Sequence, residues 1–307
     1  MSGIATNRTN ITLPADVSQE IMQKTQSASA VMRLAQQIAL PGRGLQIPVI
    51  TSDPSAAWVD ETNEKTVSNP GLSSKLMEAY KLAVIMPFSN EFRRDARALY
   101  DALVARLPGA LAMKFDSTVI GATGAPGGNF DQFSGCTAQS LVASVGHTAY
   151  DGLVAAFADI ADHGGALNGF ALSPTAEGLL LAATDGQGRP LFVNSAADGA
   201  IPRILSAPVV SSRGMYKAGV AEVGTDGGTP AVVGVAGDWT QAMYGLVDDV
   251  QLSISDQATL TYTDANSQTV NLNLWQRNMF AVRCEFEAGF VANTACFNLL
   301  TGATPSA

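Results

Sequence analysis

The most constraining part of this sequence is residues 44–92, where apolar and polar residues alternate over two stretches separated by a polar tip. The alternation predicts a first strand at Leu45–Thr51 and a return strand at Lys75–Pro87, with a tip rich in Pro, Asn and Gly at residues 62–74. No neighbouring segment offers an obvious core to cover this ribbon. Because a lone two-stranded ribbon is marginally stable and exposes unpaired backbone groups at its edges, we expect an arm that a neighbouring subunit completes.

The composition also favours an assembling protein. Of the 307 residues, 15% are charged and 47% are apolar, and the mean hydropathy is +0.15, whereas about 25% charged residues is usual for soluble proteins. This number of charged residues is too small to cover the surface of a monomer of this size. The longest apolar runs fall far short of the roughly 18–20 residues that span a membrane, so no membrane partner is expected. The N-terminus has neither the basic nor the apolar region of a signal peptide, so secretion is not expected.

The net charge is −9, and the acidic residues are spread along the chain. Tight binding of a nucleic-acid backbone over a broad basic face is therefore not expected. The three cysteines have no metal-binding spacing, which favours buried, reduced thiols. They are Cys136, Cys284 and Cys296.

Motifs for catalysis and cofactor binding are missing, so we expect neither an enzyme nor a bound cofactor or metal. The two histidines, His147 and His163, are too few for a histidine metal site and are expected at the surface or at helix ends. The glycine-rich segment at residues 121–128 is not followed by the GK[ST] sequence of a phosphate-binding loop. Residues 185–189 are better explained as a tight turn than as a calcium-binding loop. Asp248 and Asp249 would point to opposite sides of a strand, which argues against a paired acid and base.

Helical periodicity marks several further elements. An amphipathic arm is expected from Pro14 to Pro41, with Ile38 on its apolar face. Ser89 is expected to cap a long helix with Glu91 in its first turn, and Pro108 with Gly109 should kink or restart that helix. A second helix is expected near residues 150–163, with Leu153, Phe157 and Ile160 on one side.

The second half of the chain divides into two patterns. Short strands and helices alternate from residue 150 to about residue 243, which predicts a compact α/β domain. Strict alternation then follows through residues 252–290, which predicts long antiparallel strands with one solvated face. Together these patterns predict an α+β fold.

Candidate contact residues lie on the ribbon and on the helix that follows it. Trp58 either fills a local core or anchors the ribbon on an adjacent subunit, and the sequence leaves both interpretations open. The arginines near the start of the long helix suit a solvated face or ion pairs between subunits better than nucleic acid. The residues assigned to intersubunit contact are Trp58, Val59, Glu61, Arg93, Arg94 and Arg97.

The order of these segments resembles the major capsid proteins of tailed bacteriophages with the Hong Kong 97 fold. The matching pieces run almost end to end: LPADVSQEI, IPVI, AAWVDE, KLAVIMPFSNEFRRD, GATGAPGG, FALSPTAEGLLLAATDGQGRPLF, ILSAPVVSS, VAGDWTQAMYGLVDDVQLSIS and NMFAVRCEFEAGFVANTACFNLL. The resemblance implies a shell of self-associating hexamers and pentamers that encloses double-stranded DNA, a portal, and assembly in the bacterial cytoplasm.

The resemblance also implies a division of the chain. It gives an N-terminal arm at residues 1–42, an extended β-hairpin loop at 43–87, and a spine helix with the first part of a peripheral domain at 88–148. An axial α/β domain at 149–245 follows, and the peripheral β-sheet strands and C-terminus are at 246–307.

Two departures from relatives in this group bear on the expected partners. The arm motif starts at Leu13 without a preceding helical scaffolding domain, which implies a separate scaffolding protein or none. Lys65 lies where some relatives form a crosslink between subunits, but no asparagine stands out as its partner, and no crosslink is predicted. A decoration protein is left open. The alternatives are an encapsulin-type nanocompartment shell around a cargo enzyme and, from another class, a glycine-rich nucleotide-dependent enzyme.

Overall fold

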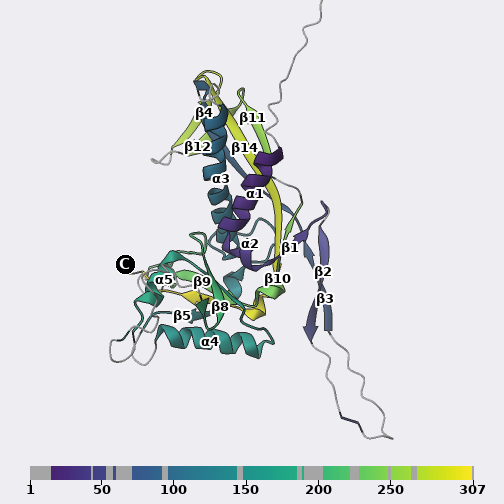
Figure 1. Cartoon of the computed structure of the whole chain (residues 1–307), viewed down its shortest axis with the longest axis vertical. Helices are drawn as coiled ribbons and strands as arrows, with labels where there is room; N and C mark the ends of the chain where they lie inside the picture. The colour runs from purple at the N-terminus through teal and green to yellow at the C-terminus, as the bar shows by residue number, and fades with distance from the viewer. Residues whose placement is uncertain are drawn as a thin grey trace, which may run out of the picture.

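The computed structural model describes residues 15–42, 44–52, 58–59, 71–91, 96–143, 148–184, 189, 203–221, 228–247, 250–263 and 268–305. The molecule is elongated, with a five-stranded sheet and a long helix in its upper part and a six-stranded sheet in its lower part (Figure 1). A two-stranded hairpin projects beside the body. This arrangement is the α+β mixture that the sequence predicts. In the described part of the chain, no helix is long and apolar enough to cross a membrane.

The five-stranded sheet is organised around one long strand. Strand β14 (Met279–Ala292) pairs antiparallel with β10 (Ala242–Leu246), β11 (Gln251–Ser255) and β4 (Tyr80–Ser89), and β1 (Gln36–Ala39) pairs parallel with β10. Helices α1 (Ala15–Ala28) and α3 (Ala96–Val119) cover one face. Alternate residues of β4 face this core and the others face solvent. The strands with one solvated face that were predicted for residues 252–290 are found in part, since β11 alternates between exposed and half-buried residues whereas most of β14 is buried.

The six-stranded sheet is mixed, with its strands in the order β5-β15-β9-β6-β8-β7. Its members are β5 (Thr137–Ser140), β6 (Gly169–Leu172), β7 (Arg203–Ile204), β8 (Ala207–Ser211), β9 (Val232–Gly237) and β15 (Phe297–Thr301). Helices α4 (Ala149–Asp162) and α5 (Pro174–Leu181) cover one face. Helix α4 begins with a capping box between Thr148 and Asp151. Short strands and helices thus alternate between residues 150 and 243 as predicted, but their sheet also includes β5 and β15 from outside that range.

Aromatic side chains join the two sheets in a continuous core. The Phe133 ring lies 4.6 Å from the Phe297 ring of the six-stranded sheet and 5.5 Å from the Phe290 ring of the five-stranded sheet, between ring centroids. Trp239 packs edge-on against Phe133 and donates its indole N–H to the Gly169 carbonyl oxygen, 3.0 Å away. This packing fixes the sheets relative to one another.

The remaining elements are short. They are helix α2 (Ala30–Leu34), hairpin strands β2 (Leu45–Ser52) with β3 (Gly71–Met77) and β12 (Thr259–Thr263) with β13 (Thr269–Asn273), and 3₁₀ turns at Phe133–Gly135, Trp239–Gln241 and Thr294–Cys296.

The prediction of a single helical arm ending at Pro41 is wrong. Ser29 interrupts the helix, and its side chain accepts the Met32 backbone N–H to cap α2, which ends at Leu34. Ile38 then lies in β1 rather than on a helix face. Tertiary pairing with β10 decides this segment, because a short apolar run fits either a helix or a strand.

The predicted return strand of the ribbon is also wrong as a single element. The chain breaks at Glu78 and Ala79, so that β3 pairs with β2 whereas β4 pairs with β14 in the body of the same chain. Residues 71–74, expected in the tip, are the beginning of β3.

Two details of the predicted helices need correction. Ser89 is the last residue of β4, and its side chain accepts the Glu91 N–H at 3.4 Å, whereas α3 is described from Ala96. The helix between residues 150 and 163 is confirmed, but Phe157 is 49% exposed while Leu153 and Ile160 are buried.

Candidate assembly surfaces

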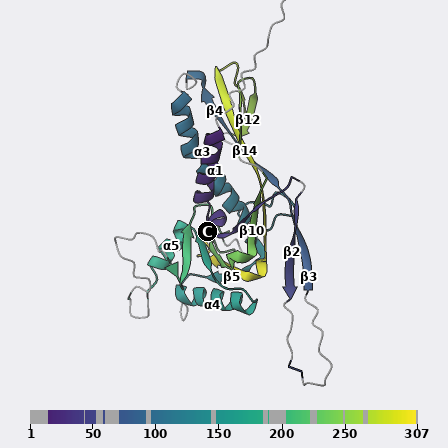
Figure 2. The same cartoon turned by 45° about the vertical axis from the view of Figure 1, so that its right-hand side comes forward.

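The β2–β3 hairpin projects from the body in both views (Figures 1 and 2). Its strands pair antiparallel with each other, from Leu45 opposite Met77 to Ser52 opposite Gly71. No third strand is described beside them, so the outer edge of each strand offers unpaired backbone groups. A projecting hairpin is therefore present, shorter than the sequence pattern suggests, and its completion by a neighbouring subunit remains a prediction.

The base of the hairpin is covered by its own chain, contrary to the expectation that the ribbon has no core. Met77 is fully buried and clusters with Leu40, Ile47 and Val291. Glycines on β10 and β14 make room for it, because a Cβ at Gly245 would lie 2.6 Å from the Met77 sulfur. The hairpin is thus anchored at its base.

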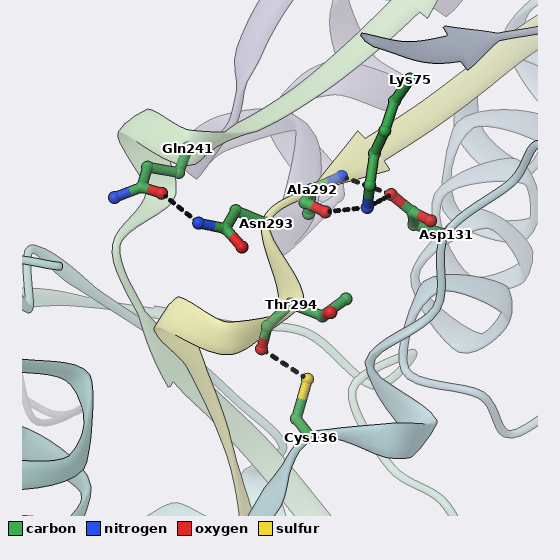
Figure 3. Close-up of polar contacts among 7 residues, drawn as sticks. All are labelled: Lys75, Asp131, Cys136, Gln241, Ala292, Asn293 and Thr294. Atoms are coloured by element: carbon green, nitrogen blue, oxygen red, sulfur yellow. Dashed lines mark hydrogen bonds and ion pairs between the residues drawn. The ribbon is translucent and has the colours of Figure 1, made fainter. Parts of the chain in front are cut away.

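A polar contact adds to this anchor (Figure 3). The Lys75 Nζ on β3 donates to Asp131 Oδ2 and to the carbonyl oxygen of Ala292, each at 2.8 Å. The same Asp131 oxygen accepts the Ala292 backbone N–H at 2.9 Å. Lys75 therefore connects the hairpin to the loop after α3 and to the end of β14.

The chain beyond β14 is fixed by two further contacts, which are also drawn in Figure 3. The Asn293 side chain donates to the Gln241 side-chain oxygen at 2.7 Å, and the Cys136 thiol donates to the Thr294 carbonyl oxygen at 3.3 Å. These bonds hold the connection from β14 to β15, so the hairpin base lies where the two sheets meet.

The structure decides between the two interpretations of Trp58. This side chain has 106% relative exposure, so it fills no core within its own chain, and Val59 beside it is 37% exposed. Its role as an anchor on a neighbour remains a prediction. The other predicted contact residues are not brought together here: Glu61, Arg93 and Arg94 lie outside the described residues, and Arg97 lies within α3.

Pro108 and Gly109 lie inside α3, which continues through both residues. A restart of the helix at this point is thereby excluded, and a bend remains a prediction. Proline has no N–H to donate to the preceding turn, which weakens the helix ladder there. Leu107 and Leu111 on either side are buried, so packing holds the helix across the weak point.

Asp116 forms a joint between three parts of the chain that sequence reasoning missed. Its carboxylate accepts the Ser29 hydroxyl at 2.5 Å and the Ser212 hydroxyl at 2.6 Å, and it also accepts the backbone N–H groups of Ala30 and Val31 at 3.0 and 3.3 Å. Burial raises the pKa of Asp116, although these four hydrogen bonds act in the opposite direction. The joint ties α3 to the N-terminal segment and to the end of β8.

A second carboxylate, Asp238, holds the turn after β9. It accepts hydrogen bonds from Ala166, Asn168, Thr240 and Gln241. Burial alone would raise the pKa of Asp238, but these hydrogen bonds outweigh it and lower the pKa below its usual value. Both carboxylates are thus engaged in holding the fold.

The described residues offer little equipment for chemistry. They contain no group of three or more His, Cys, Asp and Glu side chains arranged to hold a metal ion. All three cysteines are free, and burial raises the pKa of the Cys136 and Cys284 thiols to about 12. His163 is an exposed residue at the end of α4, as predicted. His147, Asp248, Asp249 and residues 185–188 lie outside the described residues.

Comparison with known proteins decides the family, since residues 9–292 match the family model described as the phage capsid family. The chain belongs to the phage capsid family. It is 30% identical over 296 residues to the "Probable major capsid protein gp17" of Mycobacterium phage L5, covering 92% of this chain and 86% of that protein.

Solved structures share the fold of this phage capsid chain. A structure from Mycobacterium phage Bobi has a TM-score of 0.68 at 19% identity and covers 91% of both chains. The structure named "Capsid of empty GTA particle computed with C5 symmetry" has a TM-score of 0.62 at 16% identity, covering 99% of this chain and 96% of that one. The resemblance drawn from the sequence is confirmed, and the encapsulin alternative is not favoured.

Proposed function

We propose that this chain is the major capsid protein of a tailed-phage head, and that many copies assemble into an icosahedral shell around double-stranded DNA. The observation that carries the proposal is the projecting hairpin, together with membership in the phage capsid family. Its base is anchored by Met77 and Lys75, while Trp58 beyond the base is fully exposed. An exposed tryptophan on a two-stranded arm suits a contact with a neighbouring subunit.

Each part of the chain has a proposed role in the shell. Residues 1–42 are the N-terminal arm, and the hairpin within residues 43–87 is the extended loop that overlaps the next subunit. Residues 88–148 carry the spine helix, residues 149–245 the axial domain around the hexamer and pentamer axes, and residues 246–307 the peripheral strands and C-terminus. Pro108 and Gly109 are the proposed bend in the spine helix as the shell expands.

The partners follow from this role. The shell consists of hexamers and pentamers of this chain, with a portal and a separate scaffolding protein as further partners. The net charge of −9 limits adhesion to the packaged DNA, which the shell contacts only by proximity. The protein performs no catalysis, resides in the virion, and assembles in the bacterial cytoplasm.

A deletion tests the role of the arm. Replacing residues 53–70 with a two-residue turn removes the tip with Trp58 and leaves the anchored base, including Ile47 and Lys75, in place. We expect a subunit with an unchanged unfolding midpoint that no longer forms particles in electron micrographs, whereas the wild-type chain forms them. Wild-type particles from the deletion variant would refute the role of the arm.

A further inference from the structure

A small cavity lies at the end of the five-stranded sheet that is farthest from the six-stranded sheet. Strand β14 begins there at Met279, which pairs with Ser89 at the end of β4. The other end of β14, at Ala292, leads toward β15 of the six-stranded sheet and is about 40 Å away along the strand. In Figure 1 the cavity end is the upper end of the described body, marked by the labels of β4, β11 and β12. The cavity is therefore remote from the hairpin base, where Lys75 contacts Ala292.

The cavity has a volume of about 170 Å³ and is lined by three segments that are distant in the sequence. Part of the lining is apolar, since Leu274 is fully buried and clusters with Ala281 and the half-buried Met279. Trp275 follows directly on Leu274, yet its side chain is 72% exposed. The lining residues are Asn90, Asp256, Leu274, Trp275, Asn278 and Met279.

Hydrogen bonds hold the polar part of the lining in place. In the turn between β13 and β14, the Met279 N–H donates to the Leu274 carbonyl oxygen at 2.9 Å. The Asn278 N–H donates to the Trp275 carbonyl oxygen at 3.3 Å, and Asn278 has a φ of 53°, in the left-handed region that asparagine tolerates. The Asn90 side chain donates to the Asn278 side-chain oxygen at 2.7 Å. The cavity is thus formed before any ligand binds, which limits the ordering cost of binding.

The polar side chains of the lining can both accept and donate further hydrogen bonds. Within the described part of the chain, the buried Oδ1 atom of Asn90 has no hydrogen-bond partner. A buried acceptor without a donor costs free energy, which a ligand hydroxyl would recover. The Asn278 side chain uses its oxygen for Asn90, so its amide N–H groups are the donors that it offers. The Asp256 carboxylate has about four acceptor sites and can accept from a ligand in addition to its contacts within the protein.

From this set of groups we infer that the cavity binds one pyranose ring of a glycan. A sugar ring has an apolar C–H face that packs on an exposed aromatic ring, and its hydroxyl groups both donate and accept hydrogen bonds. Trp275 supplies the aromatic surface. Asn90 and Asp256 accept from the sugar hydroxyls, and Asn278 donates to them. The site lies within one subunit, so the inference does not depend on the proposed function.

Other classes of ligand fit this cavity less well. Sites for drug-sized ligands measure about 300–1,000 Å³, so a volume of about 170 Å³ suits a single ring better than a nucleotide or a peptide. Among the described lining residues one is acidic and none is basic, which disfavours a phosphate group. Arg277 belongs to the same turn but does not line the cavity. A calcium ion takes about six to eight oxygen ligands, more than these side chains supply.

Ligand-observed saturation-transfer NMR on the unassembled full chain tests the class of ligand. The probes are the methyl glycosides of glucose, galactose, mannose and N-acetylglucosamine, and inorganic phosphate and calcium are tested in parallel by thermal unfolding. We expect saturation transfer to at least one glycoside, with a Kd on the order of 1 mM. Absence of transfer to all four glycosides would overturn the inference, and an unfolding midpoint raised by phosphate or calcium instead would assign an ion to the cavity. A chain that binds a glycoside but forms no particles would overturn the proposed function alone.

Three variants locate the binding. Trp275→Ala removes an exposed side chain, so the unfolding midpoint should stay unchanged while the Kd rises about tenfold or more. Asp256→Asn keeps the shape of the side chain but removes acceptor sites, and the Kd should rise about fivefold. The control Tyr262→Ala removes an exposed aromatic side chain of β12 that does not line the cavity, and the Kd should stay within about twofold of wild type. Unchanged binding by Trp275→Ala, or an equal loss in Tyr262→Ala, would contradict a sugar site at this cavity.

Discussion

Replacement of Asp116 by alanine should destabilise the unassembled subunit by about 2–6 kcal/mol. The carboxylate accepts hydrogen bonds from two hydroxyl groups, which can rotate to other acceptors, and from the backbone N–H groups of Ala30 and Val31, which cannot. Each buried backbone donor left without an acceptor costs about 1–3 kcal/mol. The two amides therefore give the expected range.

The pH dependence of this effect has a definite sign. Because burial raises the pKa of Asp116 above the usual aspartate value of 3.8, the folded state binds a proton more tightly than the unfolded state. The contribution of the Asp116 side chain to the free energy of unfolding is therefore greatest below pH 3.8, and it is lost as the pH rises through the raised pKa. The stability difference between wild type and Asp116→Ala should thus increase as pH falls from 7 toward 4.

Urea unfolding of the unassembled subunit, followed by far-ultraviolet circular dichroism at several pH values, measures both effects. Asp162→Ala provides a matched control, since this aspartate is exposed on α4 and its loss should change stability by less than about 0.5 kcal/mol. An Asp116→Ala subunit as stable as wild type, or a stability difference that shrinks at lower pH, would refute the reasoning about this joint.

Three further predictions concern the hairpin and the thiols. Met77→Ala should destabilise the hairpin base by about 2–5 kcal/mol, seen as faster amide exchange in β2 and β3; unchanged exchange would contradict the anchor formed with Leu40 and Val291. Trp58→Ser should leave subunit stability within about 0.5 kcal/mol of wild type but lower particle yield, and an unchanged yield would remove Trp58 from the contact. Cys284, whose pKa burial raises to about 12, should react with iodoacetamide at pH 8 only after unfolding, and modification of the folded subunit at the rate of a free thiol would contradict this.

The elements with strong local patterns could be predicted from the sequence. Apolar and polar residues alternate in β14, and this pattern indicates a strand with one face on the core. The predicted first strand of the ribbon agrees with β2 to within one residue. The helix α4 was also predictable, because its inner residues recur at helical spacing. In each case the signal lies within the segment itself.

The features that depend on distant pairing could not be predicted. Residues 78–79 carry no Pro or Gly to mark the break that sends β4 to β14. Strand β15 inserts between β5 and β9, which no local pattern specifies. Asp116 takes its partners from residues 85–96 positions away, so its role follows from packing alone.

The missed features of the candidate surfaces have a related cause. Phe157 lies at the helical spacing of the buried residues, yet it is turned toward the exposed flank of α4, because periodicity cannot say how wide a face the sheet will cover. Trp58 shows the reverse case. Its two interpretations were equal in the sequence, and only its exposure in the structure excluded a local core.

The central claim is that the working object is a closed shell of many copies. Cryo-electron microscopy of the purified chain, at rising concentration and with varied salt, tests it most directly. The account predicts closed icosahedral particles in which the β2–β3 hairpin of one subunit lies on another. Monodisperse single subunits under every condition, with the hairpin folded against its own body, would contradict it.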